Sequence, residues 1–401
     1  MLKKIKSPHK ILFVLTLIHF INYVDRQVIF PLFVFLKPEF NLSDFELGLL
    51  GSAFIIVYSF ASIPLGILAD KFKRNKIIGF GVLLWSVVTF VTGFVKNYIQ
   101  LFLTRALVAI GESSYAPAAT SILGDVFPES HRSRIMGIYN IGLYLGGAVG
   151  MIFAGIIGEN FGWRSAFLIV GIPGIILSYF AFNIYEPERI VSNHKPIISE
   201  IKELFRIPTY NFILIGATFI AFSSGSILSW ITVYTIRFQS FQLKEASLIV
   251  GFLAIISGVL GVISGGVVSD ILKNRYNKTR ALIIGFSLLL SVPFFLFALS
   301  AKSKIDFLIG LFITSFFMSW YFGPLIALIQ EVVSSNVKAT AIAFYFFFIH
   351  IFGDAFAPSI IGFFSDLYSL RLAMYLPVIT NLLSGIIFLY TIKKENQYYQ
   401  K

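Results

Sequence analysis

The sequence contains no cysteine among its 401 residues. This absence excludes a disulfide framework, thiol chemistry and a metal site with cysteine ligands. Charged side chains are also scarce, at 13% of the chain, whereas soluble globular domains contain about 25%. Hydrophobic residues make up 57% of the chain, which is more apolar surface than a water-soluble fold can bury. We therefore expect lipid to be the solvent for most of the surface.

Long hydrophobic runs have the length of membrane-spanning helices, which need about 20 mostly apolar residues. The first run follows several lysines, but it contains Asn22 and Asp25 and lacks a small-residue cleavage site. We interpret it as a membrane helix and not as a signal peptide. The runs predict an all-α membrane protein of twelve transmembrane helices with approximate ranges 11–36, 45–69, 77–95, 98–122, 135–158, 165–185, 209–236, 246–269, 280–300, 305–331, 338–363 and 371–392.

The basic residues are distributed unequally between the gaps that separate these runs. Of 32 Lys and Arg residues, 22 lie in one set of alternate gaps, eight lie in the other set, and Arg26 and Arg105 lie within helices. Such a bias indicates which loops are cytoplasmic. It predicts cytoplasmic termini in a multi-pass protein of a bacterial inner membrane. The net charge of +12 thus reflects topology, and we expect no nucleic-acid partner.

A polar, proline-containing segment, residues 186–208, separates six predicted helices from six others. It divides the chain into an N-terminal bundle, residues 1–185, and a C-terminal bundle, residues 209–401. The end of helix 2, Gly66 to Asp70, is echoed about 200 residues later at the end of helix 8. We predict two pseudo-symmetric six-helix bundles, a layout typical of secondary transporters with the substrate site between the halves.

The most specific local string is GILADKFKRNK, which begins at Gly66 and includes Asp70 and Arg74. It resembles the helix 2–3 signature of the major facilitator superfamily. An acid that ends one helix, followed by basic residues in a tight turn, suits a charge latch on the cytoplasmic side. We assign Gly66, Asp70, Arg74 and the repeat position Asp270 to such a gate. The alternative is an ordinary positively charged loop.

Small residues recur at every fourth position in predicted helices 5 and 8. Such faces allow two helix backbones to approach closely. Static packing and a sliding seam between the halves both remain open. The residues are Gly142, Gly146, Gly150 and Ala154 in helix 5, and Ser257, Gly261, Gly265 and Ser269 in helix 8.

Charged side chains within predicted membrane helices are candidate functional residues, because a charge at mid-bilayer costs about 2.5–3.5 kcal/mol or more. Helix geometry places Asn22, Tyr23 and Arg26 on one face. Structural salt bridges that only neutralise one another are the alternative. The intramembrane candidates are Asp25 and Arg26 in helix 1, Arg105 and Glu112 in helix 4, and His350 and Asp354 in helix 11.

Three strings resemble the Spinster family: NYVDR from Asn22, the stretch from Arg105 that continues as GESSYAPAATSILGDVFP, and HIFGDAFAPSIIGFFSD from His350. Members of that family are transporters of lysophospholipids and sphingoid phosphates, and the family is associated with proton-coupled movement. The resemblance implies that Asp25 and Glu112 carry the proton and that the two arginines are their charge partners. At the start of helix 11 this chain has Lys338, where the family often has arginine.

Other classes of function remain as alternatives. The anion:cation symporters, which carry sugar acids, share an NYxDR-like first helix and an Arg…Glu fourth helix, but lack the His-x-x-Gly-Asp string. A drug-efflux antiporter and a non-transporting membrane protein are further alternatives. The sequence has no HExxH motif, no nucleotide-binding loop and no appended soluble segment. We therefore expect no enzyme and no ATP-driven pump, but a monomeric transporter without cofactor or metal that moves a lipid-like or anionic small molecule with protons.

Overall fold

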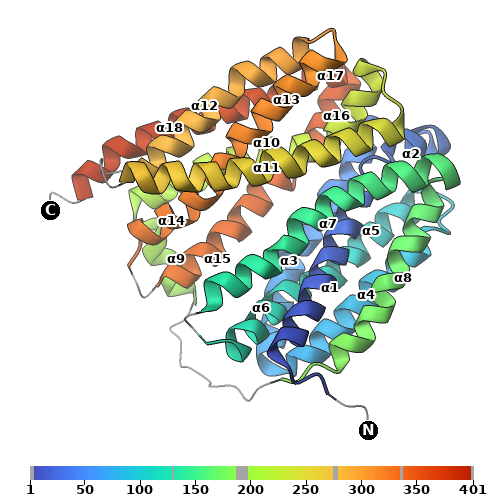
Figure 1. Cartoon of the computed structure of the whole chain (residues 1–401), viewed down its shortest axis with the longest axis horizontal. Helices are drawn as coiled ribbons and strands as arrows, with labels where there is room; N and C mark the ends of the chain where they lie inside the picture. The colour runs from blue at the N-terminus through green and yellow to red at the C-terminus, as the bar shows by residue number, and fades with distance from the viewer. Residues whose placement is uncertain (1–3, 129–130, 187–196, 274–278, 335–336, 399–401) are drawn as a thin grey trace. The chain divides into compact units, whose positions relative to one another are not determined.

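The computed structural model describes residues 4–128, 131–186, 197–273, 279–334 and 337–398, and its named elements are all helices (Figure 1). In chain order they are α1 Pro8–Val28, α2 Phe33–Phe40, α3 Asp44–Lys71, α4 Arg74–Thr92, α5 Tyr98–Ser113, α6 Tyr115–Val126, α7 Arg132–Phe161, α8 Trp163–Phe182, α9 Ile197–Phe205, α10 Pro208–Gln239, α11 Leu243–Lys273, α12 Thr279–Ser300, α13 Lys304–Met318, η2 Ser319–Tyr321, α14 Phe322–Val332, α15 Lys338–Ile349, η4 His350–Asp354, α16 Ala357–Leu367, α17 Leu370–Ala373 and α18 Tyr375–Tyr398.

Eleven helical stretches within the described residues are long and apolar enough to cross a membrane. The twelfth predicted crossing is the pair α5 and α6, which only Ser114 separates. Each predicted helix thus has a helical counterpart, and the prediction of an all-α membrane fold is confirmed.

Several predicted helices are interrupted, and prolines explain where most of the interruptions lie. Pro117 lies in the first turn of α6, Pro324 in the first turn of α14 and Pro358 in the first turn of α16. Proline has no N–H, and its ring clashes with the carbonyl four residues earlier, so it is tolerated at the start of a helix but disrupts the interior. A crossing that contains such a proline is therefore divided just before it.

The contacts divide the chain into two compact units. Unit 1 comprises residues 1–191 and 241–251, and unit 2 comprises residues 192–240 and 252–401. Residues 187–196 of the expected linker lie outside the described residues. Its later part forms α9, which the sequence analysis did not predict. The apolar residues of α9 recur at helical spacing, and Leu204 is fully buried in the core of unit 2.

Small-residue faces allow close helix contacts within each unit. A side chain at Gly142 or Gly150 of α7 would lie 2.8 Å from the Thr16 carbonyl oxygen or 2.6 Å from that of Val24, both in α1. In unit 2, Gly265 of α11 faces the backbone of Trp320. The predicted close approach is therefore present, and these contacts are internal to the units. Figure 1 shows α1 and α7 running side by side.

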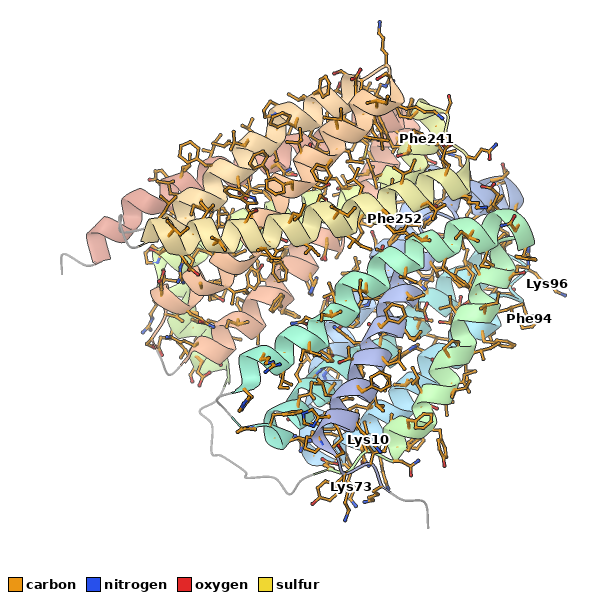
Figure 2. All side chains as sticks on the ribbon, viewed as in Figure 1. Lys10, Lys73, Phe94, Lys96, Phe241 and Phe252 are labelled. Carbon is orange, nitrogen blue, oxygen red and sulfur yellow. The ribbon has the colours of Figure 1, made fainter. Side chains whose placement is uncertain are left out.

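Large apolar side chains cover much of the outer surface of both units. Phe94 is 60% exposed and Phe252 is 55% exposed (Figure 2). In a membrane protein such surfaces face lipid. The apolar side chains that are exposed on this structure therefore contact lipid tails, and not water, when the protein lies in a bilayer. Within unit 1, Lys10 and Lys73 lie at one end, and Lys96 lies at the opposite end (Figure 2).

Candidate functional site

The central feature of unit 1 is a group of four charged residues on α1 and α5. Asp25 is 1% exposed, as are Arg105 and Glu112, while the side chain of Arg26 is 16% exposed. In α5, Arg105 and Glu112 are seven residues apart, which is close to two helical turns and puts both on the face toward α1. The fold therefore brings together the four intramembrane charges of predicted helices 1 and 4.

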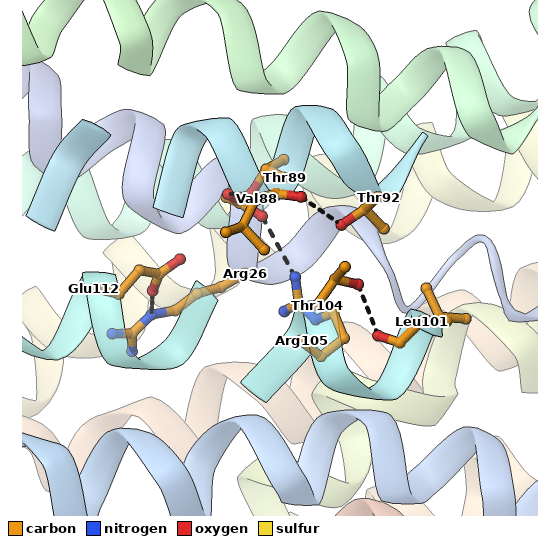
Figure 3. A network of polar contacts seen from close by, with 9 residues as sticks. Arg26, Val88, Thr89, Thr92, Leu101, Thr104, Arg105 and Glu112 are labelled. Atoms are coloured by element: carbon orange, nitrogen blue, oxygen red, sulfur yellow. Dashed lines mark hydrogen bonds and ion pairs between the residues drawn. The ribbon is translucent and has the colours of Figure 1, made fainter. Parts of the chain in front are cut away.

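The four charges form two ion pairs, each of which joins α1 to α5 (Figure 3). Arg26 donates from Nε to Oε2 of Glu112 at 2.7 Å, and Arg105 Nη1 lies 3.4 Å from Oδ1 of Asp25. Each helix supplies one acid and one base, so the group as a whole is neutral. Removing one partner of a buried pair leaves an uncompensated charge, which costs about 3–5 kcal/mol. The four residues are therefore energetically dependent on one another.

The two carboxylates differ in how completely their oxygens are hydrogen-bonded. Thr89 of α4 donates its hydroxyl to Oδ2 of Asp25, so both oxygens of Asp25 have partners. Oε1 of Glu112 is buried and has no hydrogen-bond partner among the described residues, and the same holds for Nε of Arg105. Glu112 is thus the less constrained of the two acids.

Aromatic rings surround the guanidinium group of Arg26. Its central carbon lies 4.3 Å from the ring centroid of Tyr58, 4.9 Å from Tyr23 and 5.2 Å from Phe54. Arg105 shares the Phe54 ring at 5.0 Å. A cation over an aromatic face is attracted by the ring's quadrupole. These contacts give the partly exposed cation an apolar surrounding.

Sequence reasoning missed Phe54, Tyr58 and Thr89. Phe54 and Tyr58 are four residues apart in α3 and therefore share a face. The chain contains 45 Phe and 18 Tyr residues, so this spacing gave no usable signal. Thr89 is an uncharged residue in a membrane helix, and only the position of Asp25 opposite it gives it significance.

His19 lies one turn before Asn22 and stacks on Tyr139 of α7 with ring centroids 4.2 Å apart. It is 5% exposed, and neither ring nitrogen has a hydrogen-bond partner among the described residues. The side-chain nitrogen of the buried Asn22 also lacks a partner there. Two polar residues of α1, His19 and Asn22, are therefore buried in the bundle with side-chain nitrogens that no described residue hydrogen-bonds.

His350 and Asp354 lie in unit 2, in the π-helical turn η4. His350 Nδ1 lies 2.9 Å from Oδ2 of Asp354, and the side chains are 36% and 21% exposed. The wider turn arises where Ala355 donates its backbone N–H to the carbonyl of His350, five residues earlier. Such single π turns inside helices are frequent at functional sites. The sequence could identify the i, i+4 pair but not this distortion.

The expected gate residues lie near the end of unit 1 that bears the N-terminus, apart from Asp270 in unit 2. Arg74 is 2% exposed, and it pairs with Asp125 at 2.6 Å and with Glu186 at 3.0 Å. Sequence reasoning did not identify these two acids. A Cβ at Gly66 would meet no atom within 4 Å, and Asp270 is exposed near the end of α11. The side chain of Asp70 lies outside the described part of the chain.

In the part of the chain that the structure describes, no three His, Cys, Asp or Glu side chains gather closely enough to hold a metal ion. The arrangement in unit 1 instead offers buried carboxylates that can take up a proton, and a partly exposed guanidinium that can contact an anion.

Comparison with known proteins identifies several similar transporters. The family model of the Major Facilitator Superfamily matches residues 15–353 and 274–400. The sphingosine-1-phosphate transporter SPNS2 of Danio rerio is 29% identical over 86% of this chain and 74% of its own length. Protein spinster homolog 3 of Danio rerio is 30% identical over 88% of this chain and 76% of its own length.

A solved structure has the same fold. It is the crystal structure of a bacterial homologue of the human lysosomal transporter Spinster, with a TM-score of 0.88 and 24% sequence identity, and the match covers 96% of each chain. At this identity the likeness establishes the fold alone.

Proposed function

This chain belongs to the Spinster family of the Major Facilitator Superfamily and is a membrane transporter, and we propose that it moves a single-chain anionic amphiphile, such as a lysophospholipid, by proton-coupled alternating access. The observation that supports this most directly is the neutral group of two buried ion pairs, Arg26–Glu112 and Arg105–Asp25. It combines titratable acids with the guanidinium of Arg26, of which only Nε is engaged by Glu112.

Proton coupling follows from the dependence of a carboxylate's proton affinity on its surroundings. Burial favours the protonated form of an acid, and a nearby arginine favours the ionised form. If the distance between Glu112 and Arg26 changes between the two access states, the two states bind protons differently. A proton gradient then shifts the equilibrium between the states, as coupled transport requires. The buried oxygen of Glu112 without a partner supports Glu112 as the residue that changes.

The surroundings of Arg26 support a phosphate-bearing amphiphile as the substrate. Glu112 engages only Nε, and neither terminal nitrogen of Arg26 is hydrogen-bonded to a described residue. A guanidinium fork matches two oxygens of a phosphate. The rings of Tyr23, Tyr58 and Phe54 beside it suit an acyl chain, which gains about 0.8 kcal/mol for each CH₂ removed from water. A relative named as a sphingosine-1-phosphate transporter is consistent with this chemistry.

Acyl chain length tests the substrate class. Affinity for lysophospholipids should rise as the chain lengthens, until the apolar part of the site is filled. Arg26→Ala should weaken binding of phosphate-bearing amphiphiles more than binding of neutral ones. Arg26→Lys is the matched control, because it retains the charge but loses the fork, and it should lie between wild type and Arg26→Ala. Competition for binding to the purified protein measures all three affinities. An affinity that does not change with chain length would contradict the proposal.

A second candidate, a proton-coupled symporter of sugar acids or similar organic anions, is favoured by one observation. The amide of Asn22 is 2% exposed and its nitrogen has no partner among the described residues, so it could hydrogen-bond a substrate hydroxyl. Saturable uptake of a small organic anion, together with affinity independent of chain length, would favour this candidate.

We further propose that His350 and Asp354 form a second substrate or proton site in unit 2, and that Gly66, Asp70, Arg74 and Asp270 form the cytoplasmic gate. Asp70→Asn should lower turnover without lowering expression.

The proposed organisation is two six-helix bundles, residues 1–185 and 209–401, joined by a cytoplasmic linker. The protein acts as a monomer in a bacterial inner membrane. The ion pairs of the buried Arg74 with Asp125 and Glu186 support a structured gate.

A further inference from the structure

A pocket of about 530 Å³ lies where the start of α1 meets the end of α8. It is separate from the site of Asp25 and Arg26 further along α1, because Lys10 and Arg26 are 16 residues apart, or about 24 Å along a helix. Its surface is mostly apolar, and among the residues that line it Lys10 is the only charged one. The lining residues are Ile5, Lys10, Phe13, Val14, Tyr179, Phe180 and Asn183.

Backbone pairing fixes the chain segments at one side of this pocket. Ile5 donates its N–H to the carbonyl of Asn183 at 2.8 Å and accepts from the N–H of Tyr185 at 3.0 Å. Lys6 extends its ammonium group over the ring of Tyr185, 5.8 Å from the centroid. The paired segment therefore holds a second exposed lysine close to the pocket that contains Lys10.

The pocket combines an apolar wall with basic groups at the end of a membrane-crossing helix. Phe13 is 68% exposed, Tyr179 is 49% exposed and Phe180 is 40% exposed. α1 begins at Pro8, so these rings lie near the level at which lipid headgroups begin. Aromatic and basic side chains are the usual anchors at that level. The features match the two parts of a phospholipid, an acyl chain and a charged headgroup.

We propose that this pocket binds an anionic phospholipid from the leaflet on the N-terminal side. The acyl chain lies against Phe13, Val14 and Phe180, and the phosphate lies between the ammonium groups of Lys6 and Lys10. Charge complementarity selects an anionic lipid, because the lining contains a lysine and no acid. Lysines near an anionic membrane surface are attracted to its headgroups.

Occupancy of this pocket would also stabilise the neighbouring gate residues. Asn75 donates its side-chain amide to the carbonyls of Phe182 and Ile184, at 3.1 and 3.0 Å. Arg74 binds Glu186 in the same segment. A lipid bound to Lys6 and Lys10 therefore restrains the chain segment that Arg74 and Asn75 hold from the other side.

Thermal unfolding of the purified full-length protein tests the proposal. Phosphatidylglycerol vesicles should raise the unfolding temperature more than phosphatidylcholine vesicles do. The double variant Lys6→Gln/Lys10→Gln should lose most of that difference. The matched control is Lys73→Gln/Lys76→Gln, which removes two exposed charges outside the pocket; Lys73 lies at the same end of unit 1 (Figure 2). This control should retain most of the difference, because it leaves the pocket intact, whereas general attraction to an anionic surface would fall equally in both double variants.

Native mass spectrometry of the same samples gives a second measurement. Wild type and the control variant should retain phosphatidylglycerol in preference to phosphatidylcholine, and the pocket variant should lose the preference. Equal losses in the two double variants, or no preference in wild type, would overturn the proposal. Neither result bears on the substrate proposed for Arg26.

Discussion

At the scale of single residues, the four charges of α1 and α5 depend on one another, because each acid is paired with an arginine of the other helix. Arg105 is 1% exposed, and it forms an ion pair with Asp25. Replacing either member alone leaves the other charge buried without its counter-ion. Replacing both removes two charges together, and the energetic loss is then smaller than the sum of the single losses.

A double-mutant cycle measures this dependence. Arg105→Gln and Asp25→Asn should each lower stability by about 3–5 kcal/mol. The variant with both substitutions should be more stable than either single variant, because it contains no unpaired charge at this pair. Unfolding temperatures of the purified proteins in one detergent give the comparison. Strictly additive losses would mean that the 3.4 Å pair contributes no coupling.

These residues could be predicted from the sequence because charges are rare and energetically costly inside a membrane. A charged residue within an apolar run is therefore a candidate functional residue. It did not predict which acid pairs with which arginine, since that depends on the rotation and depth of two helices. It also missed Thr89 and Tyr58, whose residue types are common in membrane helices. Their contribution is evident only from contacts with Asp25 and Arg26.

At the scale of helices, the contact between α1 and α7 depends on the absence of side chains on one face of α7. A Cβ at Gly146 would clash with the carbonyl oxygen of Phe20, whereas a Cβ at Gly137 of the same helix would meet no atom within 4 Å. Because packed cores do not deform freely, the first position is intolerant of added volume and the second is not.

Alanine substitutions separate these two positions. Gly146→Ala should destabilise the protein by about 1–3 kcal/mol through overpacking. Gly137→Ala should be neutral or stabilising by up to about 1 kcal/mol, because alanine favours a helix more than glycine does. Unfolding temperatures of the two variants, measured side by side, are the readout. Equal effects would show that α7 does not approach α1 this closely.

Helix existence and approximate extent were predictable from the apolar runs, but the interruptions inside the runs were not predicted. The break at Ser114 and the π turn at His350 lie inside segments that were each predicted as a single membrane helix. Hydrophobicity does not distinguish a continuous helix from an interrupted one. A proline indicates only the approximate position of an interruption. α9 was missed because it is short and lies in a polar segment.

At the scale of the whole molecule, the positions of basic residues predict the orientation in the membrane. Within unit 1, Lys10 and Lys73 lie at one end and Lys96 at the other (Figure 2). The excess of Lys and Arg on the side of Lys10 and Lys73 predicts that this side is cytoplasmic.

Reporter fusions test this orientation. A reporter that is active only in the cytoplasm should be active after Lys76 and inactive after Lys96. A periplasmic reporter should give the opposite pattern and serves as the control for expression. The same location for both fusion points would contradict the helix assignment, and an exchange of the two locations would contradict the predicted orientation.

Transport in proteoliposomes tests the central claim, which is that buried acids of unit 1 couple substrate movement to protons. The measurement compares transport of a lysophospholipid and a sugar acid, with and without an imposed proton gradient. Wild type should transport the lysophospholipid faster with the gradient. Asp25→Asn and Glu112→Gln should abolish the gradient-driven component and leave substrate exchange measurable. Gradient-driven transport that persists unchanged in both variants would contradict the account and assign the two acids to structure alone.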